Sequence, residues 1–314
     1  TVAMALLISI GHNGWYSEED LAAELRRLAP GADIRPASDP GNLDEITMLA
    51  VSTLKTDIAA RLPNLQLVQK LGAGVETIVN HPTVAPHVRV ARLKPEEPAR
   101  EIAEYCLAYV LREQRNLLHH AKAQTHADWD PVEPKRTHMT TVGVLGLGHI
   151  GGLTARLMAR LGFQVHGWSR TEKAIKGVTC HHGSDALPRM LGKCDYVCAI
   201  LPSTPDTRGL MDAGMLAAMK PDAVLINAGR GDLIDETALI TALDSGTPGH
   251  AVLDVLCKEP LPKDDPLWRH PSVTITPHVS GWHLGDALGD VVENLRRLGS
   301  GETLLHEVDR ARGY

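Results

Sequence analysis

The stretch Thr141–Gly152, TVGVLGLGHIGG, decides the fold expected for this chain. It opens with an apolar run of the kind that forms a buried strand, VGVL. Three glycines follow at once in the spacing G-x-G-x-x-G, namely Gly146, Gly148 and Gly151. A helical pattern of apolar residues comes directly after them, so the stretch predicts a strand, a tight turn and a helix.

Each glycine has a physical role in such a turn. Gly146 permits the sharp bend, Gly148 lets the backbone approach a pyrophosphate, and Gly151 lets the helix pack closely on the strand. The phosphates would lie at the helix N-terminus. We therefore predict dinucleotide binding, with a purely structural glycine turn as the alternative.

The segments on either side alternate between strand and helix patterns. After the glycine turn, strands are predicted at Gln164–Trp168, Asp195–Leu201, Ala223–Asn227, Ala251–Val255 and Val273–Thr276. Before it, strands are predicted at Ala5–Ile10, Ile46–Val51 and Leu65–Lys70, with Ser17 capping a helix that ends at Leu28. This alternation predicts an α/β fold with doubly wound parallel sheets.

The chain length of 314 residues predicts two domains. Lys94–Pro98, KPEEP, interrupts the pattern as a hinge, and one long helix is expected from Ala99 to about Ala127. A last helix, about His283–Leu298, is expected to cross back to the first domain. The predicted domains are 1–98 with 286–314 and 99–285, both Rossmann-like, with the active site in the cleft between them.

Composition excludes several classes of protein. The net charge of −6, without a dense basic run, argues against nucleic acid, and no apolar run is long enough to span a membrane. The five cysteines form no C-x-x-C motif, which favours a reducing, cytoplasmic compartment. The long helix carries His119, His120 and His126, which we interpret as solvated or interface residues rather than metal ligands. We expect no metal site.

Three predicted strand ends in the second half carry an arginine, a glutamate and a histidine: Arg230, Glu259 and His278. A parallel sheet brings such loops to one edge, beside the glycine turn. This set suits the reduction of a 2-oxo acid. A guanidinium binds the carboxylate and polarises the ketone, an imidazolium donates the proton, and a carboxylate keeps the imidazole protonated and oriented. For any one of the three alone, a surface ion pair or a turn histidine remains the alternative.

At this point the sequence resembles the D-isomer-specific 2-hydroxyacid dehydrogenases and, among them, the bacterial glyoxylate/hydroxypyruvate reductase A group. The resemblance runs over nearly the whole chain. The stretches that carry it are LGAGVETI at 71–78, VGVLGLGHIG at 142–151, LPSTPDTRGL at 201–210, LINAGRGDLIDETALITALDSG at 225–246, LDVLCKEPLP at 253–262, PLWRHPSVTITPHVSG at 266–281 and VDRARGY at 308–314.

The resemblance implies a role for each matching residue. Arg230 would bind substrate, Glu259 would be the partner of the histidine, and His278 would be the acid/base. The substrate would also contact Leu71, Gly72, Ala73, Gly74 and Trp282. The cofactor would contact Gly146, Leu147, Gly148, His149, Ile150, Gly151, Trp168, Ser169, Arg170, Lys173, Leu201, Pro202, Ser203, Thr207, Asn227, Ala228, Gly229, Arg230, Asp254, His278, Ser280 and Gly281.

The end of the second predicted strand bears on the choice of cofactor. Members that use NAD place an Asp at position 169, where this chain has Ser169, followed by Arg170 and Lys173. A hydroxyl and two cations suit a ribose 2′-phosphate, so we expect NADP(H) to be preferred and NAD(H) to remain possible. The segment EEPAR at 96–100 and Trp282 also depart from the common pattern.

The resemblance implies NADPH-dependent reduction of small 2-oxo acids, with glyoxylate and hydroxypyruvate as the leading substrates. A reductase for a bulkier 2-oxo acid and an NAD(H)-sensing, corepressor-type binding protein stay open as alternatives. The family also implies a homodimer formed through the long helix and its loop, about 99–140.

Overall fold

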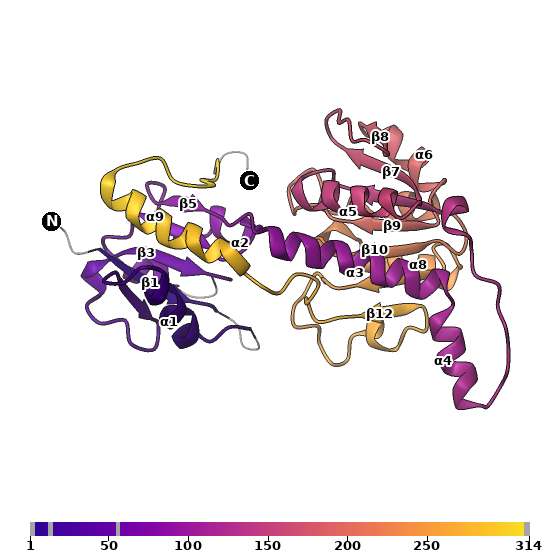
Figure 1. Ribbon diagram of the computed structural model, residues 1–314, viewed down its shortest axis with the longest axis horizontal. Coiled ribbons are helices and arrows are strands. Elements are labelled where there is room, and N and C mark those ends of the chain that lie inside the picture. Colours follow the sequence, from indigo (N-terminus) through magenta and orange to yellow (C-terminus); the bar gives the residue numbers. More distant parts are fainter. Residues whose placement is uncertain (1–3, 12–14, 55–56, 311–314) are drawn as a thin grey trace. The chain divides into compact units, whose positions relative to one another are not determined.

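The computed structural model describes residues 4–11, 15–54 and 57–310, and the chain divides into two compact units (Figure 1). The first unit comprises Thr1–Pro98 with Trp282–Tyr314, and the second comprises Ala99–Gly281. The chain returns to the first unit at Trp282, four residues before the boundary expected at residue 286. The reason is packing, because buried Leu284 belongs to the apolar core of the first unit.

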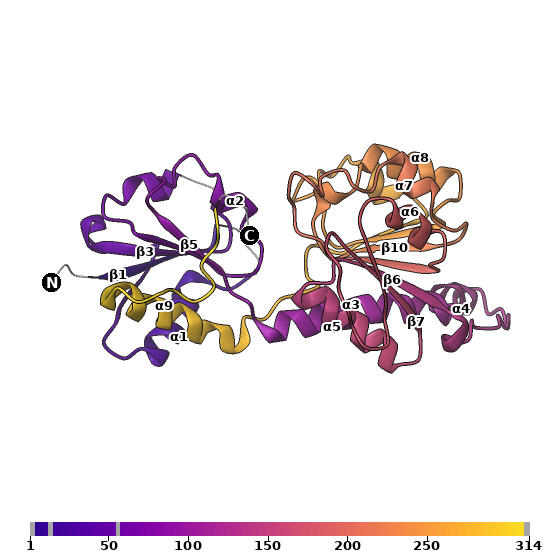
Figure 2. The same cartoon turned by 90° about the horizontal axis from the view of Figure 1, so that it is seen from above.

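The first unit contains a parallel sheet in the order β2-β1-β3-β4-β5 over the described residues. Its strands are β1 (Ala5–Ser9), β2 (Asp33–Pro36), β3 (Ile46–Val51), β4 (Leu67–Lys70) and β5 (Arg89–Ala91), and its helices are α1 (Glu18–Leu28), α2 (Glu76–Val79) and α9 (Leu288–Ser300). Helices α1 and α9 cover one face and α2 lies on the other (Figure 2). Ser17 caps α1 as predicted, because its hydroxyl accepts the Asp20 N–H at 3.0 Å.

The second unit holds a larger parallel sheet in the order β12-β11-β10-β9-β6-β7-β8. Its strands are β6 (Thr141–Leu145), β7 (Gln164–Ser169), β8 (Thr179–His182), β9 (Tyr196–Ala199), β10 (Val224–Asn227), β11 (His250–Leu253) and β12 (Val273–Ile275). Its helices are α4 (Leu117–Thr125), α5 (His149–Arg160), α6 (Ala186–Leu191), α7 (Ala213–Ala217) and α8 (Glu236–Asp244), and α3 (Glu96–Gln114) joins it to the first unit. The sheet order reverses at β6, so the glycine turn lies at the topological switch point.

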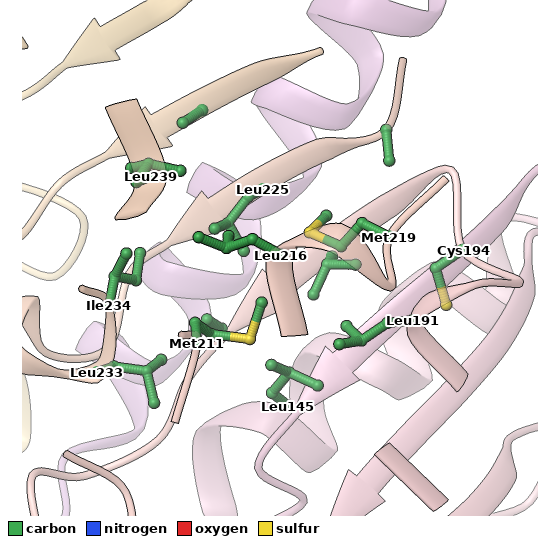
Figure 3. Close-up of a cluster of buried hydrophobic side chains, with 14 of the residues drawn as sticks. Leu145, Leu191, Cys194, Met211, Leu216, Met219, Leu225, Leu233, Ile234 and Leu239 are labelled. Carbon is green, nitrogen blue, oxygen red and sulfur yellow. The ribbon is translucent and has the colours of Figure 1, made fainter. Parts of the chain in front are cut away.

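Buried apolar side chains cover both faces of this second sheet. One cluster lies between the sheet and α6, α7 and α8, and Figure 3 shows its middle, including Leu145, Leu225 and Leu239. A second cluster packs α3 and α5 on the other face. Strand β6 is buried along its whole length because both faces are covered, which is why its sequence is a continuous apolar run.

The prediction of a single long helix from residue 99 to about 127 was wrong, because two helices, α3 and α4, cover this segment. Helix α3 begins at Glu96, within the segment expected to be a hinge, and proline is tolerated in its first turn. The helix ends at Gln114, and Asn116 in the left-handed region, at φ 53°, starts a new helix, α4. Asparagine adopts this conformation more readily than most residues. Buried Gln114 also anchors the end of α3 by donating to the Lys135 carbonyl at 2.8 Å.

Three strands had no sequence prediction: β2, β5 and β8. They are three or four residues long and occupy sheet edges, where each has one neighbouring strand in its sheet. Their sequences, DIRP, RVA and TCHH, therefore lack the apolar run that marked the central strands.

Candidate active site

The glycine turn after β6 has the geometry that its sequence predicted. Gly146 has φ 96°, and a Cβ there would lie 2.5 Å from the Ile200 carbonyl oxygen. A Cβ on Gly151 would lie 1.7 Å from the Gly146 oxygen, so only glycine permits this close packing. At Gly148 a Cβ would meet open space, and no side chain caps α5 there. The opening and the uncapped first turn of α5 fit a diphosphate.

The acidic residue after β11, Asp254, is buried and organises the loop that follows β12. One carboxylate oxygen accepts the Thr276 hydroxyl at 2.6 Å and the Val279 N–H at 2.9 Å, and the other accepts the Ser280 N–H at 2.9 Å. The backbone oxygen of Asp254 accepts the His278 N–H at 2.9 Å. Asp254 therefore fixes the backbone on both sides of His278.

His278 lies in the left-handed region at φ 56°, a conformation that costs a non-glycine residue about 1 kcal/mol or more. The contacts of Asp254 hold it there. Its ring Nδ1 lies 2.7 Å from Oε2 of Glu259, while Oε1 of Glu259 accepts the Leu256 N–H at 3.0 Å. Side chains of both members of the pair are partly exposed, at 49% for His278 and 36% for Glu259.

The pKa of Glu259 is lower than its ordinary value. Burial raises this pKa and is the largest single effect, but the lowering effects together outweigh it, chief among them the hydrogen bond and charge of His278. The Leu256 N–H and the charge of Arg230 lower it further. Glu259 is therefore ionised near neutral pH. Because an ionised carboxylate only accepts hydrogen bonds, Nδ1 of His278 carries the shared hydrogen, and Nε2 takes no part in this bond.

Arg230 follows β10 on a loop held by Asn227, whose buried side chain donates to the Arg230 carbonyl at 2.9 Å and accepts the Gly229 N–H at 3.1 Å. A Cβ on Gly229 would lie 2.8 Å from the Leu201 oxygen, and one on Gly231 would lie 1.9 Å from the Leu256 carbonyl carbon. The Arg230 loop is thus clamped between the segments after β9 and β11. The structure brings Arg230, Glu259 and His278 to the carboxyl edge of one sheet, as predicted.

Other residues expected at the cofactor have contacts within the protein. Thr207 donates to the Pro202 carbonyl at 2.6 Å, and the Ser203 hydroxyl donates to Asp232. Trp168 is a core residue whose Nε1 donates to the Gly183 carbonyl at 2.8 Å. These contacts hold the end of β7 and the loop after β9 in place.

The end of β7 carries the residues expected to select the cofactor. Ser169 is buried, and its hydroxyl donates to the Thr171 carbonyl at 2.7 Å. Arg170 is exposed and lies 3.0 Å from Asp206, which is equally exposed. An exposed pair of this kind is weak, so the guanidinium can exchange its partner at little cost.

The first unit holds the second glycine turn, Leu71–Gly74, directly after β4. Leu71 is buried, its N–H donates to the Val51 oxygen at 2.7 Å, and the Gly72 oxygen accepts the Leu93 N–H at 3.0 Å. Trp282 also belongs to the first unit, where its carbonyl accepts Nε1 of Trp15 at 2.9 Å.

The sequence prediction missed two residues behind the histidine. The hydroxyl of Tyr105 on α3 lies 2.7 Å from that of Thr276, which already donates to Asp254. Tyr105 must therefore be the donor, and burial raises its pKa well above the ordinary value and keeps its proton in place. Tyr105 carries a polar hydroxyl on the apolar face of a helix, and this pattern could have drawn attention to it. Its partner could not be predicted, because Thr276 lies 171 residues further along the chain.

Within the described ranges, no three His, Cys, Asp or Glu side chains gather as a metal would require. On α4, Nε2 of His119 lies 3.0 Å from a carboxylate oxygen of Asp130. Over the same ranges, no helix is both long enough and apolar enough to span a bilayer.

Comparison with known proteins identifies relatives over the whole chain. Residues 107–280 match the family model described as "D-isomer specific 2-hydroxyacid dehydrogenase, NAD binding domain". The chain is 34% identical over 311 residues to glyoxylate/hydroxypyruvate reductase A of Serratia proteamaculans, covering 97% of this chain and 99% of that one.

Solved structures resemble it equally over their full length. One is a D-isomer specific 2-hydroxyacid dehydrogenase from Xanthobacter autotrophicus in complex with NADPH and MES, with TM-score 0.90, 40% identity and 99% of both chains covered. Another is an NADPH-dependent glyoxylate/hydroxypyruvate reductase from Sinorhizobium meliloti in complex with NADP and sulfate, with TM-score 0.89, 31% identity and 99% of both chains covered.

Proposed function

This chain belongs to the D-isomer specific 2-hydroxyacid dehydrogenase family, and on that premise we propose that it reduces small 2-oxo acids to 2-hydroxy acids with NADPH. Glyoxylate and hydroxypyruvate are the proposed substrates. The second unit binds the dinucleotide at the glycine turn after β6. The observation that carries the proposal is the His278–Glu259 pair, 2.7 Å apart, at the sheet edge that also holds the glycine turn.

The residues of this site divide the reaction between them. When bound, NADPH supplies a hydride to the carbonyl carbon. Arg230 binds the carboxylate and polarises the carbonyl, so that charge on its oxygen is stabilised as it develops. Nε2 of His278 donates a proton to that oxygen, which completes the hydroxyl group. The Glu259 carboxylate stabilises the imidazolium beforehand and holds its ring in place.

Two observations support the choice of NADPH. Position 169 holds a serine, which does not repel a 2′-phosphate as an acid does, and Arg170 lies next to it with an exposed guanidinium. The relatives from Xanthobacter and Sinorhizobium were solved with NADPH and NADP.

The direct test is the loss of NADPH absorbance when glyoxylate or hydroxypyruvate is added to the purified protein. We expect turnover with both acids and the formation of glycolate and glycerate. A panel of larger 2-oxo acids, run beside them, separates a small-substrate reductase from one for bulkier acids. Absence of turnover with every acid would refute the proposal.

Glu259→Gln is expected to move the pH profile of reduction to lower pH. The glutamine keeps the shape of the side chain but removes the charge that stabilises the His278 imidazolium. In the native enzyme the lowered pKa of Glu259 keeps this charge in place near neutral pH and releases it only as pH falls through that pKa. In the variant this charge is absent at every pH, so the protonated ring that the proposed reaction needs is less stabilised, and activity declines earlier as pH rises.

The measurement is kcat/KM for glyoxylate as a function of pH. Asp244→Asn is a matched control, because Asp244 pairs with another histidine, His270, at 3.3 Å and lies outside the site. An unchanged profile in Glu259→Gln would show that Glu259 does not set the protonation of His278.

We also propose a homodimer formed through the segment 99–140. Large apolar side chains are exposed there, including Leu117, Leu118 and Met139, and Trp129 is 97% exposed. Such a group on one segment is typical of a surface that another protein covers.

Sedimentation at micromolar concentration is expected to give twice the mass of one chain. Leu118→Glu is expected to weaken the dimer, whereas Leu28→Glu, at an exposed leucine on α1, serves as the control. A monomer in the unmodified protein would contradict this assembly.

A further inference from the structure

An arginine of the first unit lies beside the second glycine turn. Arg92 comes directly after β5, and the turn Leu71–Gly74 comes directly after β4. Because β4 and β5 are paired and parallel, both segments leave the sheet at the same edge. Nη1 of Arg92 lies 3.4 Å from the Ala73 carbonyl oxygen, which places the guanidinium against the turn.

The guanidinium has an unusual environment. It is half-buried, and in the described part of the chain no carboxylate lies within ion-pairing distance of it. Burial lowers the pKa of Arg92, and Glu76 opposes this effect only from a distance. The contact of 3.4 Å with Ala73 is too long for a strong hydrogen bond. Removing a cation from water costs free energy, and the few contacts of this guanidinium offset little of that cost. A bound anion would offset more of it.

The turn itself presents hydrogen-bond donors next to this cation. The N–H groups of Gly72, Ala73 and Gly74 donate no hydrogen bond within residues 4–11, 15–54 and 57–310. Consecutive amides of this kind form a concave site for an anion. Lys70 is also near the turn, since its Cε is 3.5 Å from the position of a Cβ on Gly72, although its ammonium donates to the Ser52 carbonyl. The guanidinium of Arg92 therefore lies against a turn with three available amide donors.

We infer that Arg92 binds the carboxylate of the 2-oxo acid together with the amides of Gly72–Gly74. A carboxylate only accepts hydrogen bonds, and both a forked guanidinium and backbone amides only donate them. This inference rests on the proposed function for the identity of the anion. In this role Arg92 holds the unreactive end of the substrate.

The reaction leaves the substrate carboxylate unchanged, so Arg92 binds the ground state and the transition state alike. Loss of such binding raises KM and leaves kcat nearly unchanged. A charge-assisted contact with a carboxylate corresponds to roughly a tenfold to hundredfold change in affinity.

The experiment uses the full-length protein and oxalate, a dicarboxylate that resembles glyoxylate. Calorimetric titration gives the Kd of oxalate for the unmodified protein and for Arg92→Met, Arg92→Lys and Arg89→Met. Arg89 is the matched control, because it lies on β5, three residues before Arg92, but pairs with Glu307 at 2.6 Å. We expect Arg92→Met to weaken oxalate binding and raise KM for glyoxylate by about tenfold to hundredfold. Arg92→Lys restores part of both, and Arg89→Met changes neither.

Thermal unfolding without oxalate separates binding from a structural role. If Arg92 only supports the turn through Ala73, Arg92→Met lowers Tm and leaves the Kd of oxalate unchanged, which would overturn the inference. If Arg92 binds the anion, Tm without oxalate stays the same or rises, and the rise in Tm caused by oxalate is reduced. An equal loss of oxalate affinity in Arg89→Met would also overturn it, because the effect would then be one of general charge.

The proposed function fails in a different way. An unmodified protein that binds oxalate through Arg92 but reduces no 2-oxo acid refutes the function and leaves the anion site standing. A protein that reduces glyoxylate equally well with Arg92→Met refutes the inference and leaves the function standing.

Discussion

His278→Ala is expected to lower kcat for glyoxylate reduction by about 10²–10⁴, the usual contribution of a positioned acid/base. The variant removes the only proton donor that the proposed reaction uses. Nε2 of this ring is available for the reaction because Nδ1 is bonded to Glu259 at 2.7 Å. The affinity for NADPH, measured by fluorescence titration, should change little, since the glycine turn after β6 is not altered.

The control for this variant is His270→Ala. His270 also pairs with a carboxylate, that of Asp244, but it comes before β12, at the opposite end of the strand that His278 follows. Loss of His270 should leave kcat nearly unchanged. Near-native turnover in His278→Ala, or an equal loss in His270→Ala, would show that His278 is not the proton donor.

The cofactor preference gives the second large effect. Ser169→Asp/Arg170→Ala is expected to reverse the preference for NADPH over NADH. Loss of the contact between Arg170 and the 2′-phosphate removes roughly 1.5–3 kcal/mol, which is one to two powers of ten in affinity. The new acid repels the phosphate and can bond the 2′-hydroxyl of NADH. Ser169 is buried but is the last residue of β7, and Arg170 is exposed, so both changes fall at the end of the strand.

The measurement is kcat/KM for NADPH and for NADH in the native enzyme and in the double variant. Arg189→Ala, which removes an exposed arginine of α6, controls for the loss of positive charge. Equal values for the two cofactors in the native enzyme would contradict the proposed preference. An unchanged ratio in the double variant would show that other residues select the cofactor.

The sequence was sufficient to predict the sheet edge and the loops that meet there. The run VGVL and the spacing of Gly146, Gly148 and Gly151 indicated a strand and a tight turn, and the turn has the required conformation. The order of Arg230, Glu259 and His278 indicated one active edge, because the carboxyl ends of parallel strands coincide. These features are local or follow from topology, so a linear pattern can encode them.

The contacts between segments far apart in the sequence became known only from the tertiary structure. Three examples are the contact of Tyr105 with Thr276, the contact of Arg92 with the turn Leu71–Gly74, and the packing of Leu284 in the first unit. No sequence pattern links the residues that meet in these contacts. The break at Asn116 was also hidden, because the amino-acid types on either side of it are compatible with a continuous helix. Hydrophobic periodicity specifies which face of an element is buried, whereas the partner of each polar side chain depends on how the elements pack.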